Sequence, residues 1–189
     1  TYVNARLANH YGIEGIEGDA MQRIALPQAG RLGFLTQGAW LMATSHRTRT
    51  SPVRRGKWVL EELLPAAPPP PPPNVEGLIE DVDQTLPLRE RMEQHRADPA
   101  CAACHVNMDP IGFGLEKFDA TGAYRLMDAG EPIDSTGLLL GNAPFDDGVS
   151  MARAIRQHPN LGPCMLEKLV TYSLGRTLAP EEACMVDDI

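Results

Sequence analysis

The chain has 189 residues, enough for one ordinary domain or two small ones. Its formal net charge is −8, opposite in sign to that of a typical nucleic-acid-binding protein, so we expect no nucleic-acid partner. No run of about 18 apolar residues occurs, so we predict that no segment spans a membrane. Hydrophobic residues make up 43% of the chain but aromatic residues only 5%, and a large flat cofactor would supply the missing apolar surface.

Capping and turn residues predict helices in the first third of the chain. Residues 1–12 are expected to form a helix that ends at Gly12. Apolar side chains recur at helical spacing within residues 30–46. Ser51 and Pro52 suit the N-cap and the first turn of another helix, which we expect to run to Leu64.

A run of six prolines, Pro68 to Pro73, follows these helices. Proline lacks the backbone N–H that helices and central strands need, so we expect a stiff polyproline II spacer. We therefore divide the chain into an N-terminal helical region (1–65), a Pro-rich strap (66–75) and a C-terminal region (76–189). Because Thr1 opens what reads as the middle of a helix, we expect a processed form or the C-terminal part of a longer protein.

The C-terminal region is predicted to be mostly helical. A helix is expected over residues 86–97, where Asp98 and Pro99 end it. Residues 124–141 favour at most a small hairpin. Two more helices are expected over about 149–157 and about 163–174, the second ending at Gly175.

The string Cys-Ala-Ala-Cys-His at residues 101–105 carries the chemistry. In a c-type haem site, two thiols with this spacing reach the two vinyl groups at one edge of the haem, and the following histidine lies under the iron. Histidine is a ligand type expected at haem iron. We therefore predict one covalently attached haem c, bound through Cys101 and Cys104 with His105 as the proximal ligand.

Other interpretations of the two thiols are weaker. A thioredoxin-type redox pair would require a surrounding βαβ pattern, which the sequence lacks. A zinc site would require two more ligands, for which Cys164, Cys184 and His158 are the available side chains. Zinc has no special need of a histidine directly after the second cysteine, so the haem interpretation is preferred.

The distal iron ligand stays open between His46, in a polar turn, and Met165, near the start of the last helix. Met108 lies only three residues after His105, so we expect it to pack against the wall of the site. An unoccupied distal position is a further possibility. Arg49 and Arg54 are candidates to bind the haem propionates, because a guanidinium group matches carboxylate geometry. The other interpretation of these arginines is a solvated helix start. They belong to a basic cluster of Arg47, Arg49, Arg54, Arg55 and Lys57.

Two further sets of residues have two interpretations each. Cys164 and Cys184 are expected to form a disulfide, because haem c is usually attached outside the bacterial cytoplasm, where disulfides persist. The alternative is two buried thiols. Asp109, Glu116 and Asp119 suit Ca²⁺, but we prefer helix and turn capping for them.

Several long strings resemble the C-terminal region of large secreted planctomycete-type cytochrome c proteins, which consist of domains of unknown function. They are TSHRTRTSPVRRGKWVLE from residue 44, the Pro-rich run, CAACHVNMDPIGFGLEKFDATGAYR from residue 101, and CMLEKLVTYSLGR from residue 164. The resemblance implies an exported haem protein with Cys101, Cys104 and His105 as its haem site.

We expect a mainly α fold: a cytochrome c-like haem domain over residues 76–189, a helical N-terminal extension, the strap, and little β structure. The helix before the motif is expected to pack against the last helix, as the terminal helices of small cytochromes c do. The expected function is one-electron transfer in the periplasm or outside the cell, with a protein redox partner. The alternatives are an open-site, peroxidase-like haem enzyme and a structural haem subunit of a larger assembly.

Overall fold

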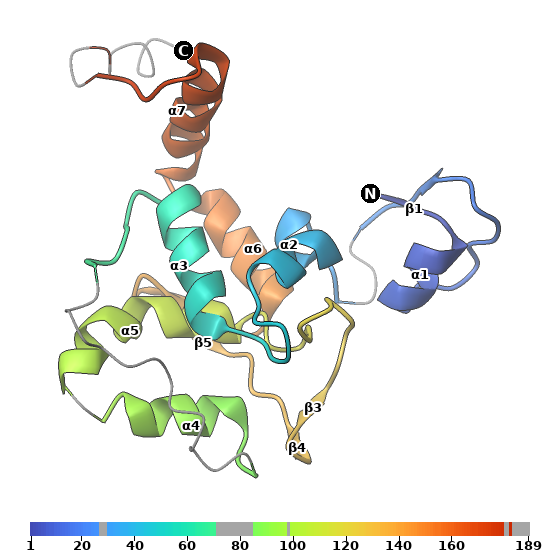
Figure 1. Ribbon diagram of the computed structural model, residues 1–189, viewed down its shortest axis with the longest axis horizontal. Coiled ribbons are helices and arrows are strands. Elements are labelled where there is room, and N and C mark those ends of the chain that lie inside the picture. The colour runs from blue at the N-terminus through green and yellow to red at the C-terminus, as the bar shows by residue number, and fades with distance from the viewer. Residues whose placement is uncertain (27–29, 71–84, 98, 180–181, 183–189) are drawn as a thin grey trace.

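The computed structural model describes residues 1–26, 30–70, 85–97, 99–179 and 182. Within them the chain is mainly α, with three small two-stranded sheets (Figure 1). The helices are α1 (Ala5–Tyr11), α2 (Gly38–Ala43), α3 (Pro52–Glu62), α4 (Leu88–His95), α5 (Pro99–Phe113), α6 (Gly148–Gln157) and α7 (Leu161–Leu174), with a 3-10 turn at Phe34–Thr36. The antiparallel strand pairs are β1 (Tyr2–Val3) with β2 (Gln22–Arg23), β3 (Met127–Asp128) with β4 (Glu131–Pro132), and β5 (Gly137–Leu139) with β6 (Ala143–Phe145).

Capping residues set the helix ends as predicted. The Ser51 side chain accepts a hydrogen bond from the backbone N–H of Arg54, and Pro52 occupies the first turn of α3. Gly12 and Gly175 end α1 and α7 in the left-handed conformation, which glycine adopts without steric cost. These local signals mark the helix ends, but the helix predicted over residues 1–12 begins only at Ala5, after the strand β1 at Tyr2–Val3.

A short N-terminal unit, made of β1, α1 and β2, has its own small apolar cluster around Val3 and Tyr11. Tyr11 also connects it to the body of the protein. Its hydroxyl accepts a hydrogen bond from the Gly38 N–H at 2.8 Å, and the guanidinium carbon of Arg31 lies 3.8 Å from its ring centroid. Arg31 is nearly fully buried and donates to the carbonyls of Thr36 and Gly122.

The main core lies where α3 crosses α5, and side chains from both sides of the Pro-rich run contribute to it (Figure 1). Leu60 and Leu64 belong to the same cluster as Ile111 and Leu115. Residues 63–70 contain neither helix nor strand, and Pro71 to Pro73 lie outside the described residues. The predicted division at this run therefore separates parts of the sequence that share one core.

The expected packing of the helix before the motif against the last helix is wrong. Figure 1 shows α4 and α7 at opposite ends of the molecule. Leu88 and Met92 of α4 pack against Phe113 of α5. Lys168 of α7 instead forms an ion pair at 2.8 Å with Glu62, at the end of α3. Hydrophobic periodicity identifies an apolar face but not the helix that covers it.

No helix among the described residues is both long enough and apolar enough to cross a membrane.

Candidate functional site

The Cys101–His105 motif occupies the first two turns of α5. Cys101 and Cys104 are three residues apart and therefore lie on neighbouring positions of one helix surface. Both thiols are free and partly buried, and Cys104 packs against the main core. The His105 side chain is 17% exposed, so it also lies at the boundary between the core and solvent.

The remainder of α5 holds this segment in place. Met108 and Ile111 are buried in the main core. That Met108 forms part of the wall of a haem site stays a prediction. Pro110 lies inside the helix, and the helix continues past it to Phe113. The face of α5 that carries Met108 and Ile111 is thus covered by α3, and this fixes the direction of the motif.

Asp109 orients the ring of His105. The two atoms Nδ1 of His105 and Oδ1 of Asp109 lie 2.9 Å apart, one helical turn from each other. A carboxylate in its ionised form only accepts hydrogen bonds, and beside such a group Nδ1 of His105 is the donor. In the neutral ring the lone pair therefore resides on Nε2, the atom suited to bind a metal. Sequence reasoning assigned Asp109 to capping, although its i,i+4 spacing from His105 was visible.

The second oxygen of Asp109 faces Arg96, which follows the end of α4. Nε of Arg96 lies 3.6 Å from Oδ2 of Asp109, an ion pair longer than a hydrogen bond. The Asp109 side chain is 0% exposed, and within the described part of the chain Oδ2 has no hydrogen-bond partner. Arg96 and Asp109 therefore join α4 to the histidine of the motif.

The two candidates for a distal ligand lie in other parts of the structure. Met165 lies on α7 and lines an apolar cavity of about 500 Å³ together with Phe34 and Ile155. His46 lies in the loop between α2 and α3, and burial, followed by the charges of Arg49 and Arg54, lowers its pKa. The structure thus places both side chains in elements other than α5, and His46 does not line the cavity that Met165 lines.

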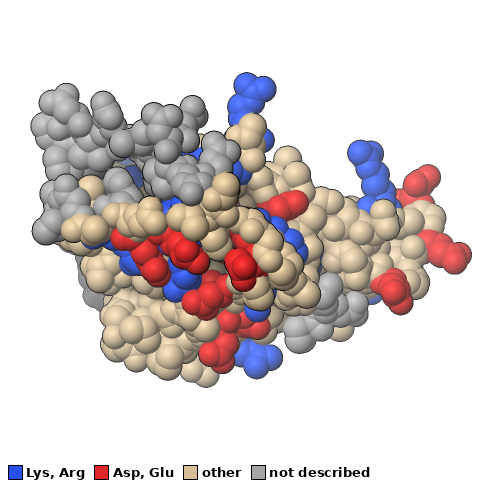
Figure 2. Space-filling view, turned by 90° about the horizontal axis from the view of Figure 1, so that it is seen from below, with Lys and Arg blue, Asp and Glu red and all other residues tan. Residues whose placement is uncertain are grey.

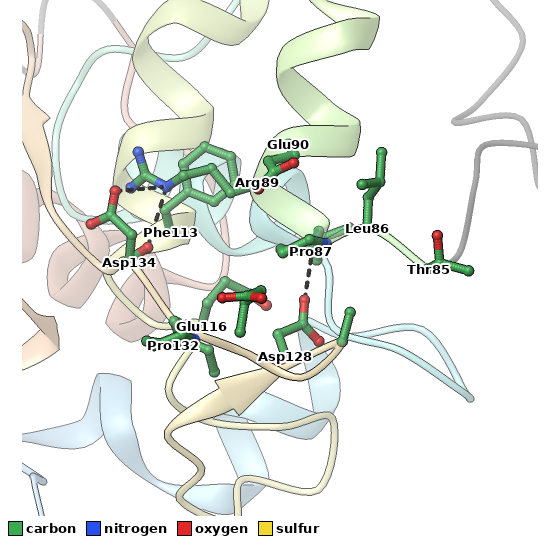
Figure 3. A pocket seen from close by; sticks show the side chains of 14 residues that line it. Thr85, Leu86, Pro87, Arg89, Glu90, Phe113, Glu116, Asp128, Pro132 and Asp134 are labelled. Carbon is green, nitrogen blue, oxygen red and sulfur yellow. Dashed lines mark hydrogen bonds and ion pairs between the residues drawn. The ribbon is translucent and has the colours of Figure 1, made fainter.

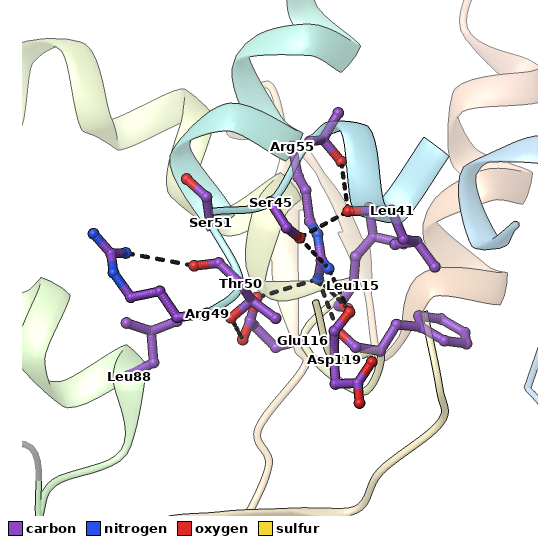
Figure 4. A network of polar contacts seen from close by, with 12 residues as sticks. Leu41, Ser45, Arg49, Thr50, Ser51, Arg55, Leu88, Leu115, Glu116 and Asp119 are labelled. Atoms are coloured by element: carbon purple, nitrogen blue, oxygen red, sulfur yellow. Dashed lines mark hydrogen bonds and ion pairs between the residues drawn. The ribbon is translucent and has the colours of Figure 1, made fainter. Parts of the chain in front are cut away.

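The basic cluster contains one residue that is not on the surface. Arg55 is fully buried, and Figure 4 shows its guanidinium group pointing into a network beneath α3. It donates to the carbonyls of Leu115 and Phe118 at 2.9 Å and lies 3.4 Å from Glu116 Oε1. A solvated helix start is therefore wrong for Arg55, whose partners are Ser45 and residues of the segment 115–119.

The two arginines proposed for the propionates have local partners. Arg54 Nη1 donates to the Ser45 carbonyl at 3.1 Å. Arg49 Nη1 donates to the Thr50 carbonyl at 3.4 Å, as Figure 4 shows. These bonds hold both side chains beside the loop that precedes α3. Their role toward a propionate stays a prediction.

The acidic residues considered for Ca²⁺, for which capping is the preferred interpretation, have separate partners. Glu116 accepts from Thr50 and Arg125, and burial raises its pKa while Arg55 opposes the shift. Asp119 accepts from the backbone N–H groups of Thr121 and Ala123. No group of three or more potential metal ligands occurs among the described residues. Capping and internal ion pairs account for these carboxylates.

Cys164 is buried at the start of α7, and its Sγ lies 3.6 Å from the Glu62 carbonyl oxygen. Burial raises the pKa of its thiol, which Lys168 partly offsets. The predicted disulfide partner, Cys184, lies outside the described residues, so this pairing stays a prediction.

A second cavity, of about 480 Å³, lies between α4 and the β3–β4 hairpin (Figure 3). Acidic side chains dominate its charged lining, although Arg89 also reaches it. The acidic residues that line it are Glu90, Glu116, Asp128, Glu131 and Asp134. Figure 2 shows the molecule from below, where acidic side chains gather near the middle with some basic side chains among them. Neither this cavity nor the apolar one beside α7 is lined by the motif residues.

A comparison with protein families gives one match. The model of the PSCyt3 family, described as a protein of unknown function (DUF1588), matches residues 31–128, which is 98 of the 189 residues. The matched range contains α2 to α5 and therefore the whole Cys101–His105 motif. No curated protein and no solved structure matches the chain.

Proposed function

Because the chain belongs to the PSCyt3 family, a domain family found in planctomycete cytochrome c-like proteins, we propose that it is a monohaem c-type cytochrome. Its role would be one-electron transfer in the periplasm or outside the cell. The observation that carries this proposal is the placement of Cys101, Cys104 and His105 on one surface of α5, with the His105 ring held by Asp109.

The donor atoms present suit a covalently attached haem. Both thiols are free and only partly buried, so they can form thioether bonds to the haem edge. Donation from Nδ1 of His105 to Asp109 would put the lone pair of the neutral ring on Nε2, the atom that would bind the iron. The haem, once bound, supplies a metal centre that cycles between Fe(II) and Fe(III). The protein would attach it, orient the proximal histidine and set the charge around it.

The charge of the chain supports a protein partner of opposite sign. The formal net charge is −8, and acidic side chains gather on the face in Figure 2. Such a surface attracts a basic redox protein and accelerates the encounter, with a rate that falls as salt screens the charges. We propose a small basic electron carrier, or a basic subunit of a larger assembly, as the partner.

One observation favours a second candidate, an open-site haem enzyme. His46 lies in the loop between α2 and α3, whereas Met165 lies on α7 and lines a cavity that His46 does not line. A haem on α5 without a protein ligand on its distal side would bind small molecules there. Peroxidase-like chemistry would then be accessible, with His105 and Asp109 on the proximal side.

Spectroelectrochemistry and CO binding distinguish the two candidates. The chain is produced in bacteria that attach haem c and is titrated between its oxidised and reduced forms. A reversible one-electron wave with low-spin bands and no rapid CO binding is the expected result for electron transfer. High-spin bands with rapid CO binding would contradict it in favour of the enzyme. The variants His46→Ala and Met165→Ala then show whether either residue provides the distal ligand, because only the true ligand's loss shifts the bands.

A further inference from the structure

We infer that Asp109 is a positioning residue that, through His105, lowers the reduction potential of the haem iron, and that Arg96 opposes this effect. The inference rests on the proposed function. It predicts opposite changes for two neighbouring residues, a pattern that a purely structural role would not give.

The geometry makes the Asp109–His105 pair rigid. Both residues lie in α5, four positions apart, so the helix backbone fixes the distance between their Cα atoms. The Asp109 side chain is fully buried, and its Oδ1 lies 2.9 Å from Nδ1 of His105. Water therefore does not compete for Oδ1, and the bond keeps its full strength in a medium of low dielectric constant.

A buried carboxylate that accepts the Nδ1 proton makes the imidazole ring a stronger electron donor. This outer-sphere arrangement fixes the tautomer of a metal-binding histidine and raises its basicity. A more strongly donating ligand stabilises Fe(III) relative to Fe(II), so the reduction potential falls. Asp109 thus favours the oxidised state of the bound iron.

Arg96 moderates the donation. Its Nε lies 3.6 Å from Oδ2 of Asp109, and its side chain is 23% exposed. The positive charge attracts the carboxylate electrons and weakens the pull of Asp109 on the His105 proton. Removal of the Arg96 charge should therefore lower the reduction potential further. This fall should be smaller than the rise caused by loss of the Asp109 charge, because solvent screens the partly exposed Arg96.

The test is the midpoint potential of the haem-loaded chain and of two variants. In Asp109→Asn the shape and the acceptor oxygen are retained but the charge is lost, and the iron's preference for Fe(III) should fall about tenfold. That change corresponds to a rise of about 59 mV for a one-electron couple. In Arg96→Gln the potential should fall.

The matched control is Glu93→Gln. Glu93 is 49% exposed and contacts Arg96 at 3.7 Å. The variant therefore removes a negative charge from the same neighbourhood without altering a residue that contacts the histidine. Its potential should stay close to that of the unaltered chain. Equal shifts in Glu93→Gln and Asp109→Asn would overturn the inference, since general electrostatics would then suffice.

Other outcomes are equally decisive. If the unaltered chain retains haem covalently and neither variant shifts the potential, the proposed function stands and the Asp109 inference fails. If the unaltered chain binds no haem, both fail. If Asp109→Asn does not fold, the variant Arg96→Gln, at a partly exposed position, still provides the test. An unchanged or raised reduction potential in Arg96→Gln would contradict the inference.

Discussion

Gly56 of α3 lies directly against the backbone of Met108 in α5. A Cβ atom at Gly56 would approach the Met108 carbonyl oxygen to 1.9 Å. The contact has a counterpart in the opposite direction, because a Cβ atom at Gly112 would lie 2.1 Å from the Pro52 carbonyl oxygen. The two helices therefore touch through their backbones at two glycines. This crossing fixes the direction of α5 and, with it, the Cys101–His105 motif at its start.

Replacement of Gly56 by alanine should destabilise the fold. Backbone atoms cannot move aside as a flexible side chain can, so α3 must shift away from α5. We expect a loss of about 3 kcal/mol in the free energy of unfolding, at the upper end of the usual cost of overpacking. Urea denaturation followed by circular dichroism measures it.

Gly162→Ala is the matched control for that variant. Gly162 also lies in a helix, and a Cβ atom there meets nothing within 4 Å. Alanine should be neutral or stabilise the protein by up to about 1 kcal/mol. Equal losses of stability in the two variants would contradict the close crossing.

Arg55 holds together three segments that are distant in the sequence. Its guanidinium group donates to carbonyls after α5 and to the Ser45 hydroxyl, and it pairs with Glu116. Arg55→Met should cost about 3–5 kcal/mol, because it leaves buried acceptors and a buried carboxylate without this partner. Thermal unfolding reports the change.

The comparison for Arg55 is Lys57→Met. Lys57 and Glu61 form an exposed pair at 3.5 Å on the outer face of α3, and loss of such a pair costs about 1 kcal/mol or less. A small effect at Arg55, similar to that at Lys57, would show that the buried network does not hold the fold together.

Asp119 should contribute to stability in a pH-dependent manner. Burial acts to raise the pKa of this carboxyl, but hydrogen bonds from Thr121 and Ala123 outweigh it, so the pKa lies below its ordinary 3.8. The contribution is therefore present above the unfolded-state pKa and is lost as pH falls through the folded-state value.

Urea unfolding of the parent chain and Asp119→Asn at about pH 6 and about pH 3 tests this linkage. The parent should lose more stability than the variant on acidification. The exposed residue Glu14 provides a control, Glu14→Gln, which should follow the parent. An Asp119→Asn profile parallel to that of the parent would be inconsistent with a lowered pKa.

Local signals in the sequence were sufficient to predict most helices. Ser51 with Pro52, and the glycines at 12 and 175, mark helix ends through backbone chemistry that does not depend on tertiary contacts. The single small hairpin expected at most within residues 124–141 is present as β3 and β4, but a second hairpin, β5 with β6, also starts in this range. The last helix begins at Leu161, two residues before the predicted start.

Tertiary relationships were less accessible from sequence. The positive charge of Arg55 suggested a surface position, whereas five acceptors from separate segments converge on it. The predicted packing partner of α4 was wrong, because the apolar positions of an amphipathic helix do not identify the surface that covers them. Asp109 could have been connected with His105 by its i,i+4 spacing, but its burial depends on how α5 packs.

The central claim is that α5 carries a covalently attached haem. The most direct measurement is the reduced absorption spectrum of the purified chain before and after acid–acetone extraction, beside a Cys101→Ser, Cys104→Ser double variant. We predict that colour stays with the unaltered protein after extraction and that the double variant loses it to the solvent. A colourless protein, or haem that leaves the unaltered chain as readily as the variant, would contradict the account.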